Sequence, residues 1–181
     1  MNPFHTALAE LQSATDQLDL SSLARAAEMI ANASRIVAYG CGREGLQIAG
    51  LVMRLHQLGL RAAMHGDMAA PPVGKGDLFV CSAGTGEMAT VSALMRVARD
   101  AGAEVLFLTA NPKTPSASLA SHILTIPARL NGQDRPEAAA LTMGAVYEGA
   151  MFLMFEIMVL DLREQLGVAP DTMRARQTNM E

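Results

Sequence analysis

The stretch Arg35-Ile36-Val37-Ala38-Tyr39-Gly40-Cys41-Gly42-Arg43-Glu44-Gly45 runs from an apolar, strand-like segment into a glycine-rich turn. A second stretch of the same kind follows later in the chain, Asp77-Leu78-Phe79-Val80-Cys81-Ser82-Ala83-Gly84-Thr85-Gly86-Glu87. A strand that ends in glycines and hydroxyls and then opens a helix directs backbone N–H groups and the positive end of the helix dipole into one spot. One such turn is a weak signal. The pair predicts a single anion-binding crevice built from both turns.

Strands and helices are expected to alternate around these turns. The pattern of apolar residues predicts helices at 3–18 and 21–33, with Ser21 as the N-cap of the second. It predicts strands at 35–39, 61–65, 77–82, 104–109 and 122–126, and helices at 44–58, 87–101 and 115–120. Gly59 and Gly102 are expected to end the first two of those helices. The fold class is therefore α/β, a three-layer αβα sandwich with helices on both faces of a parallel sheet.

The C-terminal half adds a loop, a long helix and a tail. Residues 127–139 are polar, with prolines at both ends, and are expected to form a loop over the edge of the sheet. The helix expected at 141–166 is apolar almost all round, so part of it is predicted to be covered by another subunit. We expect one domain in all: N-terminal helices at 1–34 that pack on the core, the core at 35–166, and a tail at 167–181 that reaches a neighbouring subunit.

Composition excludes several classes of protein. The chain has 181 residues, a formal net charge of −4 and no cluster of Lys and Arg, which argues against a nucleic-acid surface. Cys41 and Cys81 do not make a disulfide framework, and with no secretory signal they indicate a cytoplasmic protein. The most apolar run, 150–160, is too short for a bilayer and contains Glu156, so no membrane span is expected. No His, Cys or carboxylate cluster has metal-ligand spacing, so no metal is predicted.

Ligands of an open parallel sheet bind beyond the carboxyl ends of its strands. That rule groups Gly40 to Gly45, Asp67, Ser82 to Glu87, Thr109 to Thr114 and the 127–139 loop around one site. Ser82 and Thr85 supply hydroxyls there, and the glycines let the backbone approach an oxyanion closely, so a phosphate is the expected guest. For either turn alone, the alternative is that its glycines only permit a tight strand-to-helix turn.

Several motifs resemble the sugar isomerase (SIS) domain family, and within it the 6-phospho-3-hexuloisomerases. The resemblance covers 35–165 and the C-terminus. Gly40 to Gly45 matches Gly-x-Gly-Arg-Ser-Gly except at Glu44, and 53–59 looks like Met-Arg-Leu-x-x-Leu-Gly. The second turn is similar to Ser-x-Ser-Gly-Glu-Thr, with Met88 in the last position. The segment 143–148 resembles Met-Gly-x-x-Phe-Glu, and 176–181 resembles Arg-His-Ala-Asn-Leu-Glu.

The resemblance implies a flavodoxin-like five-stranded sheet, a homodimer or homotetramer, and a sugar-phosphate site shared between subunits. The implied reaction moves a carbonyl between adjacent carbons of a hexulose phosphate through an enediol, with no metal or redox cofactor. Glu148 would be the base, and its place on an apolar helix should raise its pKa. The alternative for Glu148 is a structural ion pair with an arginine. The substrate-binding residues would be Gly42, Arg43, Glu44, Asp67, Ser82, Gly84, Thr85, Gly86 and Glu87.

Three departures from the family pattern fall at ligand-facing positions. Glu44 puts a negative charge where the family's serine would bind phosphate, and Met88 replaces a hydroxyl. Gln177 replaces a histidine that a neighbouring subunit contributes to the catalytic site, and an amide cannot shuttle protons at neutral pH. His65, at the end of a strand, could supply the missing acid. These departures suggest either a different ligand, such as a sugar with another anionic or amino group, or lost isomerase activity.

Two other functions stay open. Glu44 and Gln177 favour a non-catalytic sugar-phosphate-binding or regulatory SIS protein. Gly40-x-Gly42-x-x-Gly45 is also a literal dinucleotide fingerprint, with Asp67 placed to hold a ribose. Against the dinucleotide hypothesis, a dehydrogenase needs a substrate domain that this chain cannot easily house, and the second turn would be unexplained.

Overall fold

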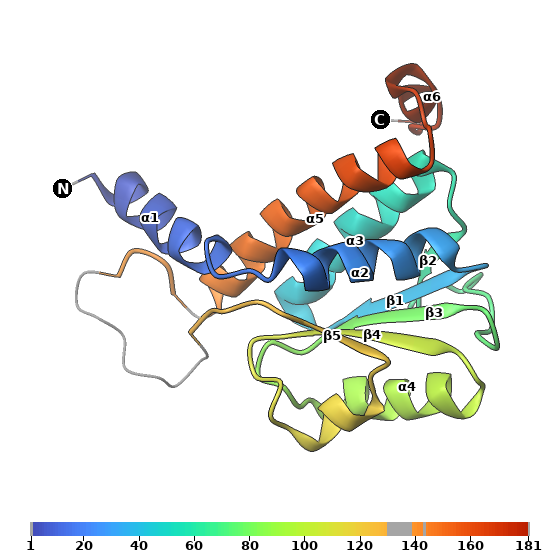
Figure 1. The fold of residues 1–181 in the computed structure, drawn as a ribbon, viewed down its shortest axis with the longest axis horizontal. Coiled ribbons are helices and arrows are strands. Elements are labelled where there is room, and N and C mark those ends of the chain that lie inside the picture. Colours follow the sequence, from blue (N-terminus) through green and yellow to red (C-terminus); the bar gives the residue numbers. More distant parts are fainter. Residues whose placement is uncertain (1, 130–138, 143, 181) are drawn as a thin grey trace.

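The computed structural model describes residues 2–129, 139–142 and 144–180. Within them, a sheet of five parallel strands forms the middle layer of the molecule (Figure 1). The strand order is β2-β1-β3-β4-β5. The strands are β1 (Ile36–Gly40), β2 (Ala62–Met64), β3 (Leu78–Ser82), β4 (Glu104–Thr109) and β5 (His122–Thr125). The predicted α/β class and the flavodoxin-like sheet are confirmed.

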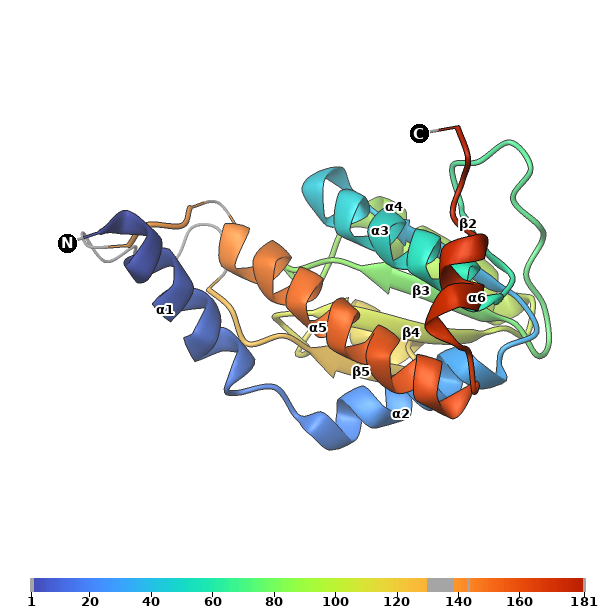
Figure 2. The same ribbon diagram turned by 90° about the horizontal axis from the view of Figure 1, so that it is seen from above.

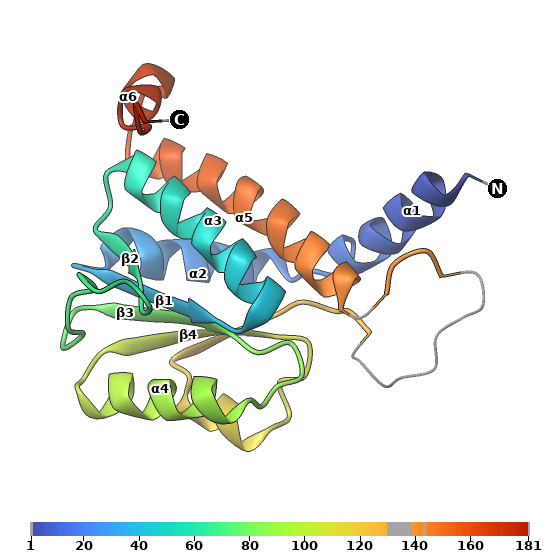
Figure 3. The same ribbon diagram turned by 180° about the vertical axis from the view of Figure 1, so that it is seen from behind.

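Helices cover both faces of this sheet. Helices α2 (Leu20–Asn32), α3 (Gly42–Leu58) and α5 (Ala145–Gln165) lie on one face, and α4 (Ala89–Asp100) with the short 3-10 helix η1 (Pro115–Leu119) lies on the other (Figures 1 and 3). Helix α1 (Pro3–Thr15) packs against α5 and extends beyond the sheet, and α6 (Pro170–Ala175) packs against α3. Each face of the sheet has its own cluster of buried apolar side chains, the larger one beneath α2, α3 and α5.

Four details differ from the sequence predictions. Helix α2 is capped by Asp19, whose carboxylate accepts from Ser21 N at 2.9 Å, so Ser21 is not the cap. A carboxylate accepts from the free amides of a helix start at least as well as a hydroxyl does. Helix α5 begins at residue 145 and not at 141, after Gly144 in the left-handed conformation (φ 83°). Helix α1 stops at Thr15, before the predicted 18. Helix α6, in the tail, was not predicted.

Helix α5 has apolar side chains on the side that faces away from the sheet. Phe152 is 53% exposed and Ile157 is 51% exposed. Helix α3 runs beside α5 (Figure 2) and exposes Leu46 and Met53. Among the described residues, no helix is both long enough and apolar enough to cross a membrane.

Candidate functional site

The two glycine-rich turns begin side by side at the carboxyl end of the sheet. Strands β1 and β3 are neighbours, and Gly40 is paired in register with Ser82. The first turn leads directly into α3, and the second leads into α4. Neither N-cap residue, Cys41 or Met88, caps its helix with a side-chain hydrogen bond. Both helix starts therefore keep backbone N–H groups available at this end of the sheet.

The glycines of the first turn serve close backbone packing. A Cβ atom on Gly45 would lie 2.5 Å from the carbonyl oxygen of Gly40, and a Cβ atom on Gly40 would lie 2.9 Å from the amide nitrogen of Gly45. Gly42 has a φ of 56°, in the left-handed region that favours glycine. The end of β1 and the first turn of α3 thus touch through bare backbone. The glycines of the first turn therefore fit the alternative given above, that they permit a tight turn from strand to helix.

The side chain of Glu44 reaches from the first turn to the second. Its Oε2 accepts a hydrogen bond from Ser82 Oγ at 2.6 Å, and both carboxylate oxygens lie 3.1 Å from the Gly84 amide nitrogen. Glu44 is half-buried, while Ser82 and Gly84 are buried. The predicted crevice, in which both turns bind one guest anion, is therefore wrong for this structure. The Glu44 carboxylate of the first turn fills the hollow, and the donors that bind it, Ser82 and Gly84, both belong to the second turn.

Tyr147 completes the surroundings of Ser82, and the sequence analysis missed it. Its side chain is buried, and its hydroxyl lies 3.0 Å from Ser82 Oγ. Burial raises the pKa of the Tyr147 hydroxyl well above its ordinary value, so the group stays neutral and available as a hydrogen-bond donor. The available signal was that Tyr147 stands where the family motif has Phe, which adds one polar atom to a buried helix face.

Glu148, the predicted base, is buried in the first turn of α5 with 7% of its surface exposed. Arg43 Nη2 lies 2.7 Å from its Oε2, and the Arg43 side chain is 66% exposed. Burial raises the pKa of the Glu148 carboxyl, the positive charge of Arg43 opposes that rise, and the negative charge of Glu44 adds to it. Glu148 therefore has both the arginine partner of the structural alternative and the raised pKa of the catalytic one.

The outer part of the second turn faces solvent. Thr85 and Glu87 are exposed, and Thr85 Oγ1 donates to the Glu87 carbonyl at 3.2 Å. The segment after β4 holds this turn in place, because Thr114 Oγ1 donates to the Gly86 carbonyl at 2.6 Å. Gly86 itself has a φ of 91°. The turn is thus fixed from outside, with the Thr85 side chain at its surface.

His65 and Asp67 lie apart from Glu148 in this structure. Both are exposed and follow β2, the edge strand beyond β1. Asp67 Oδ2 accepts from Met64 N at 3.2 Å, and the His65 ring meets the Tyr39 ring edge-on at 5.6 Å. They line a hollow of about 510 Å³ together with side chains of the other sheet face, including Phe79.

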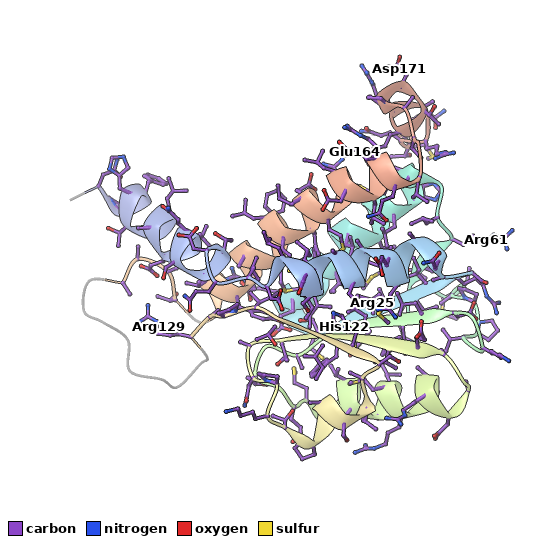
Figure 4. The ribbon with its side chains drawn as sticks, in the orientation of Figure 1. Arg25, Arg61, His122, Arg129, Glu164 and Asp171 are labelled. Atoms are coloured by element: carbon purple, nitrogen blue, oxygen red, sulfur yellow. The ribbon has the colours of Figure 1, made fainter. Side chains whose placement is uncertain are left out.

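Gln177 lies on the far side of the molecule from these turns. It follows α6, where Arg176 Nη1 donates to the Gln57 carbonyl near the end of α3 at 3.1 Å. Figure 4 shows the separation: Asp171 of α6 and Arg129, which follows the carboxyl end of β5, are at opposite ends of the molecule. Within one chain, Gln177 does not meet Glu148. Met143, Glu181 and residues 130–138 of the expected loop lie outside the described residues.

No group of three or more His, Cys, Asp or Glu side chains in the described part of the chain is placed to hold a metal ion. The site consists instead of two acidic side chains, one arginine, two hydroxyls and backbone amides. Such a set can bind a polar organic ligand and move a proton.

The doubly wound sheet with its crevice at a strand end defines a class of α/β ligand-binding domains. The model of the SIS domain family matches residues 29–157, so this chain belongs to that family. Its sequence is 28% identical over 172 residues to the 3-hexulose-6-phosphate isomerase of Mycobacterium gastri, covering 95% of this chain and 86% of that one. The enzyme of the same name from Bacillus subtilis is 27% identical over 175 residues, covering 96% and 95%.

Solved structures give the same fold. A Methanococcus jannaschii protein, whose structure infers a function of 3-hexulose-6-phosphate isomerase, superposes with a TM-score of 0.85 at 17% identity over 100% of both chains. The Vibrio vulnificus NanR protein in complex with ManNAc-6P superposes with a TM-score of 0.76 at 27% identity, over 96% of this chain and 66% of that one.

Proposed function

We propose that this protein is an isomerase that moves a carbonyl group between adjacent carbons of a hexulose phosphate. The observation that carries the proposal is Glu148, a buried carboxyl with a raised pKa at the crevice, beside the guanidinium of Arg43. A carboxylate with a raised pKa is a better acceptor for a carbon-bound proton than an ordinary one. The similar proteins of Mycobacterium gastri and Bacillus subtilis carry the name of that reaction.

The proposed reaction balances without a co-reactant. Glu148 takes the proton from the carbon next to the carbonyl, and the carbonyl oxygen gains a proton, which gives the enediol. The neighbouring hydroxyl then loses its proton to form the new carbonyl, and Glu148 returns its proton to the former carbonyl carbon, so one O–H proton is lost for each one gained. Arg43 is positioned to stabilise the negative charge that develops on the oxygen of the enediol. The backbone N–H groups at the uncapped start of α4 are the donors that we assign to the phosphate, because Ser82 and Gly84 already bind Glu44 and Thr85 Oγ1 donates to the Glu87 carbonyl.

We further propose an oligomer of two or four subunits with a shared site. The exposed apolar side of α5, with Phe152 and Ile157, is suited to burial against a second copy of this chain. In such an assembly Gln177 would enter a neighbour's site, since it lies far from Glu148 in its own chain. The free thiols of Cys41 and Cys81 fit a cytoplasmic protein.

The test is Glu148→Gln, assayed by NMR as conversion of 3-hexulose 6-phosphate to a 2-hexulose 6-phosphate. We expect turnover to fall by about 10²–10⁴-fold, the usual worth of a general base. Glu156→Gln is the matched control, because Glu156 lies on the same helix but binds Arg54 at 3.0 Å. The proposal fails if Glu148→Gln keeps the rate of the natural protein.

One observation favours a second function, sugar-phosphate binding without catalysis. The hydroxyl and the amide that the two turns offer are engaged by Glu44, and the similar NanR protein has been seen in complex with a sugar phosphate. A natural protein that binds hexose phosphates and never interconverts them would establish this second function.

A further inference from the structure

The space between the two turns is a small seat that the protein fills itself. We use "seat" for the position bounded by Ser82 Oγ, the Gly84 amide and the Tyr147 ring, where the Glu44 carboxylate lies. A Cβ atom on Gly84 would be 3.0 Å from Glu44 Oε1 and 3.3 Å from Tyr147 Cδ1. The absence of a side chain at Gly84 is therefore what admits the carboxylate.

The hydrogen bonds of the seat all run toward this carboxylate. A serine hydroxyl has one proton, and Ser82 donates it in the 2.6 Å hydrogen bond to Glu44 Oε2. The Tyr147 hydroxyl, 3.0 Å from Ser82 Oγ, is then the donor in its bond to Ser82. The Gly84 amide also donates to Glu44. A second anion at the seat would find these donors already engaged.

The charges nearby oppose a second anion as well. Glu44 and Glu148 are close enough for the charge of one to raise the pKa of the other. Arg43, two-thirds exposed, is the cation paired with Glu148. A phosphate dianion placed at the seat would add two negative charges to two carboxylates that face one guanidinium. A neutral hydroxyl adds none, and a carboxylate has about four lone-pair positions, so Glu44 can accept from more than Ser82 and Gly84.

We propose that Glu44 determines ligand specificity by acting as a built-in anion: its carboxylate fills the seat, accepts hydrogen bonds from the hydroxyl groups of the neutral part of a sugar, and excludes phosphate. The inference rests on the proposed function only in taking the crevice beside Glu148 as the ligand site. It assigns the phosphate of any phosphorylated substrate to a position outside the seat. It also identifies one residue whose replacement converts the seat into a phosphate site.

The experiment is calorimetric titration of the natural protein and of Glu44→Ser with inorganic phosphate. Opening the seat frees the Ser82 hydroxyl and the Gly84 amide and removes one like charge, so we expect Glu44→Ser to bind phosphate at least about tenfold more tightly. Adding Ser82→Ala to Glu44→Ser should remove most of that gain. With an unphosphorylated ketohexose as the titrant the order should reverse, because the acceptor carboxylate is lost.

Glu104→Ser is the matched control. It also removes a carboxylate, but Glu104 is exposed at the first residue of β4, at the opposite end of the sheet from the seat. Its phosphate affinity should stay within about twofold of the natural value. If Glu44→Ser does not fold, Glu44→Ala serves in its place, since it also removes the charge and empties the seat. The inference is overturned if neither Glu44 variant gains phosphate affinity, or if Glu104→Ser gains as much.

These titrations involve no turnover, so their result is independent of whether the protein isomerises any sugar. A natural protein that turns over hexulose phosphate, with no phosphate gain in the Glu44 variants, overturns this inference and leaves the proposed function standing. If the Glu44 variants gain phosphate affinity while the natural protein does not isomerise hexulose phosphate, the inference stands and the proposed function is overturned.

Discussion

The two turns resemble each other in sequence and differ in what their glycines do. In the first turn, Gly40 and Gly45 bring two stretches of backbone into contact. In the second, Gly84 leaves room for the side chain that the first turn sends across. A glycine-rich turn between a strand and a helix is therefore not an anion site by itself. The acceptor that its amides bind depends on the rest of the chain, and here the Gly84 amide binds the Glu44 carboxylate.

The largest effect that breaks this comparison is expected from Gly45→Ala. Its new methyl group would meet the Gly40 carbonyl at 2.5 Å, and backbone cannot move aside cheaply. We expect a loss of about 2–3 kcal/mol in the free energy of unfolding, measured with urea. Gly50→Ala is the control, because it lies in the same helix with open space around it and should gain up to about 1 kcal/mol. Equal effects at the two positions would refute the conclusion that Gly45 is needed for close backbone packing in the first turn.

A smaller effect is expected from Gly84→Ala, which sharpens the comparison at the second turn. The new methyl group would press on the Glu44 carboxylate and the Tyr147 ring, at a cost of about 1–2 kcal/mol by urea unfolding. In a Glu44→Ser background, part of that cost should disappear, because only the ring contact remains. Strict additivity of the two substitutions would show that Gly84 and Glu44 do not interact.

The smallest effect concerns pH. Because burial raises the pKa of Glu148, the folded protein keeps that proton at pH values where the unfolded chain has lost it. In this window the native state binds more protons, so the free energy of unfolding of the natural protein falls as pH rises. Glu148→Gln has no proton to lose at this position. Its stability relative to the natural protein should therefore grow with pH through the window and level off above the raised pKa.

Glu44 links this pH window to the two turns. Its negative charge is one of the causes of the raised pKa of Glu148. Replacing Glu44 with Ser should therefore lower the folded-state pKa of Glu148. The upper pH limit of the window then moves to lower pH, and the window becomes narrower. Urea unfolding at a series of pH values, with and without each substitution, measures both changes. If the difference in free energy of unfolding between the natural protein and Glu148→Gln is constant across pH, the pKa of Glu148 is not raised.

The fold was predictable because local signals and the overall architecture agree. Apolar strand-like runs alternate with helical patterns, and Gly59 and Gly102 both take positive φ values at or just after a helix end, as predicted. The cap of α2 was missed because Asp19 and Ser21 both suit that position, and only the backbone path decides between them. Helix α6 was missed because six residues carry too little periodicity to predict a helix.

Only part of the membership of the candidate site was predictable. The strand-end rule placed Gly40 to Gly45 and Ser82 to Glu87 together, and Gly40 and Ser82 are indeed register partners. The direction of the Glu44 side chain was not predictable, because it depends on contacts with residues about forty positions away in the sequence. The same holds for the Tyr147 hydroxyl, whose only partners are assembled by the fold. His65 and Asp67 follow the edge strand β2, and their local sequence does not show that this strand lies at the edge of the sheet.

Arg43 and Glu44 are consecutive residues in one helical turn, yet their charges have opposite effects on Glu148. The positive charge of Arg43 lowers the pKa of Glu148, and the negative charge of Glu44 raises it. The proton on Glu148 and the inward position of Glu44 are therefore thermodynamically coupled, and the coupling works in both directions. Any displacement of the Glu44 carboxylate from the seat lowers the pKa of Glu148, and deprotonation of Glu148 in turn makes that displacement easier. The protonation state of Glu148 is thus connected to whether the Glu44 carboxylate occupies the seat.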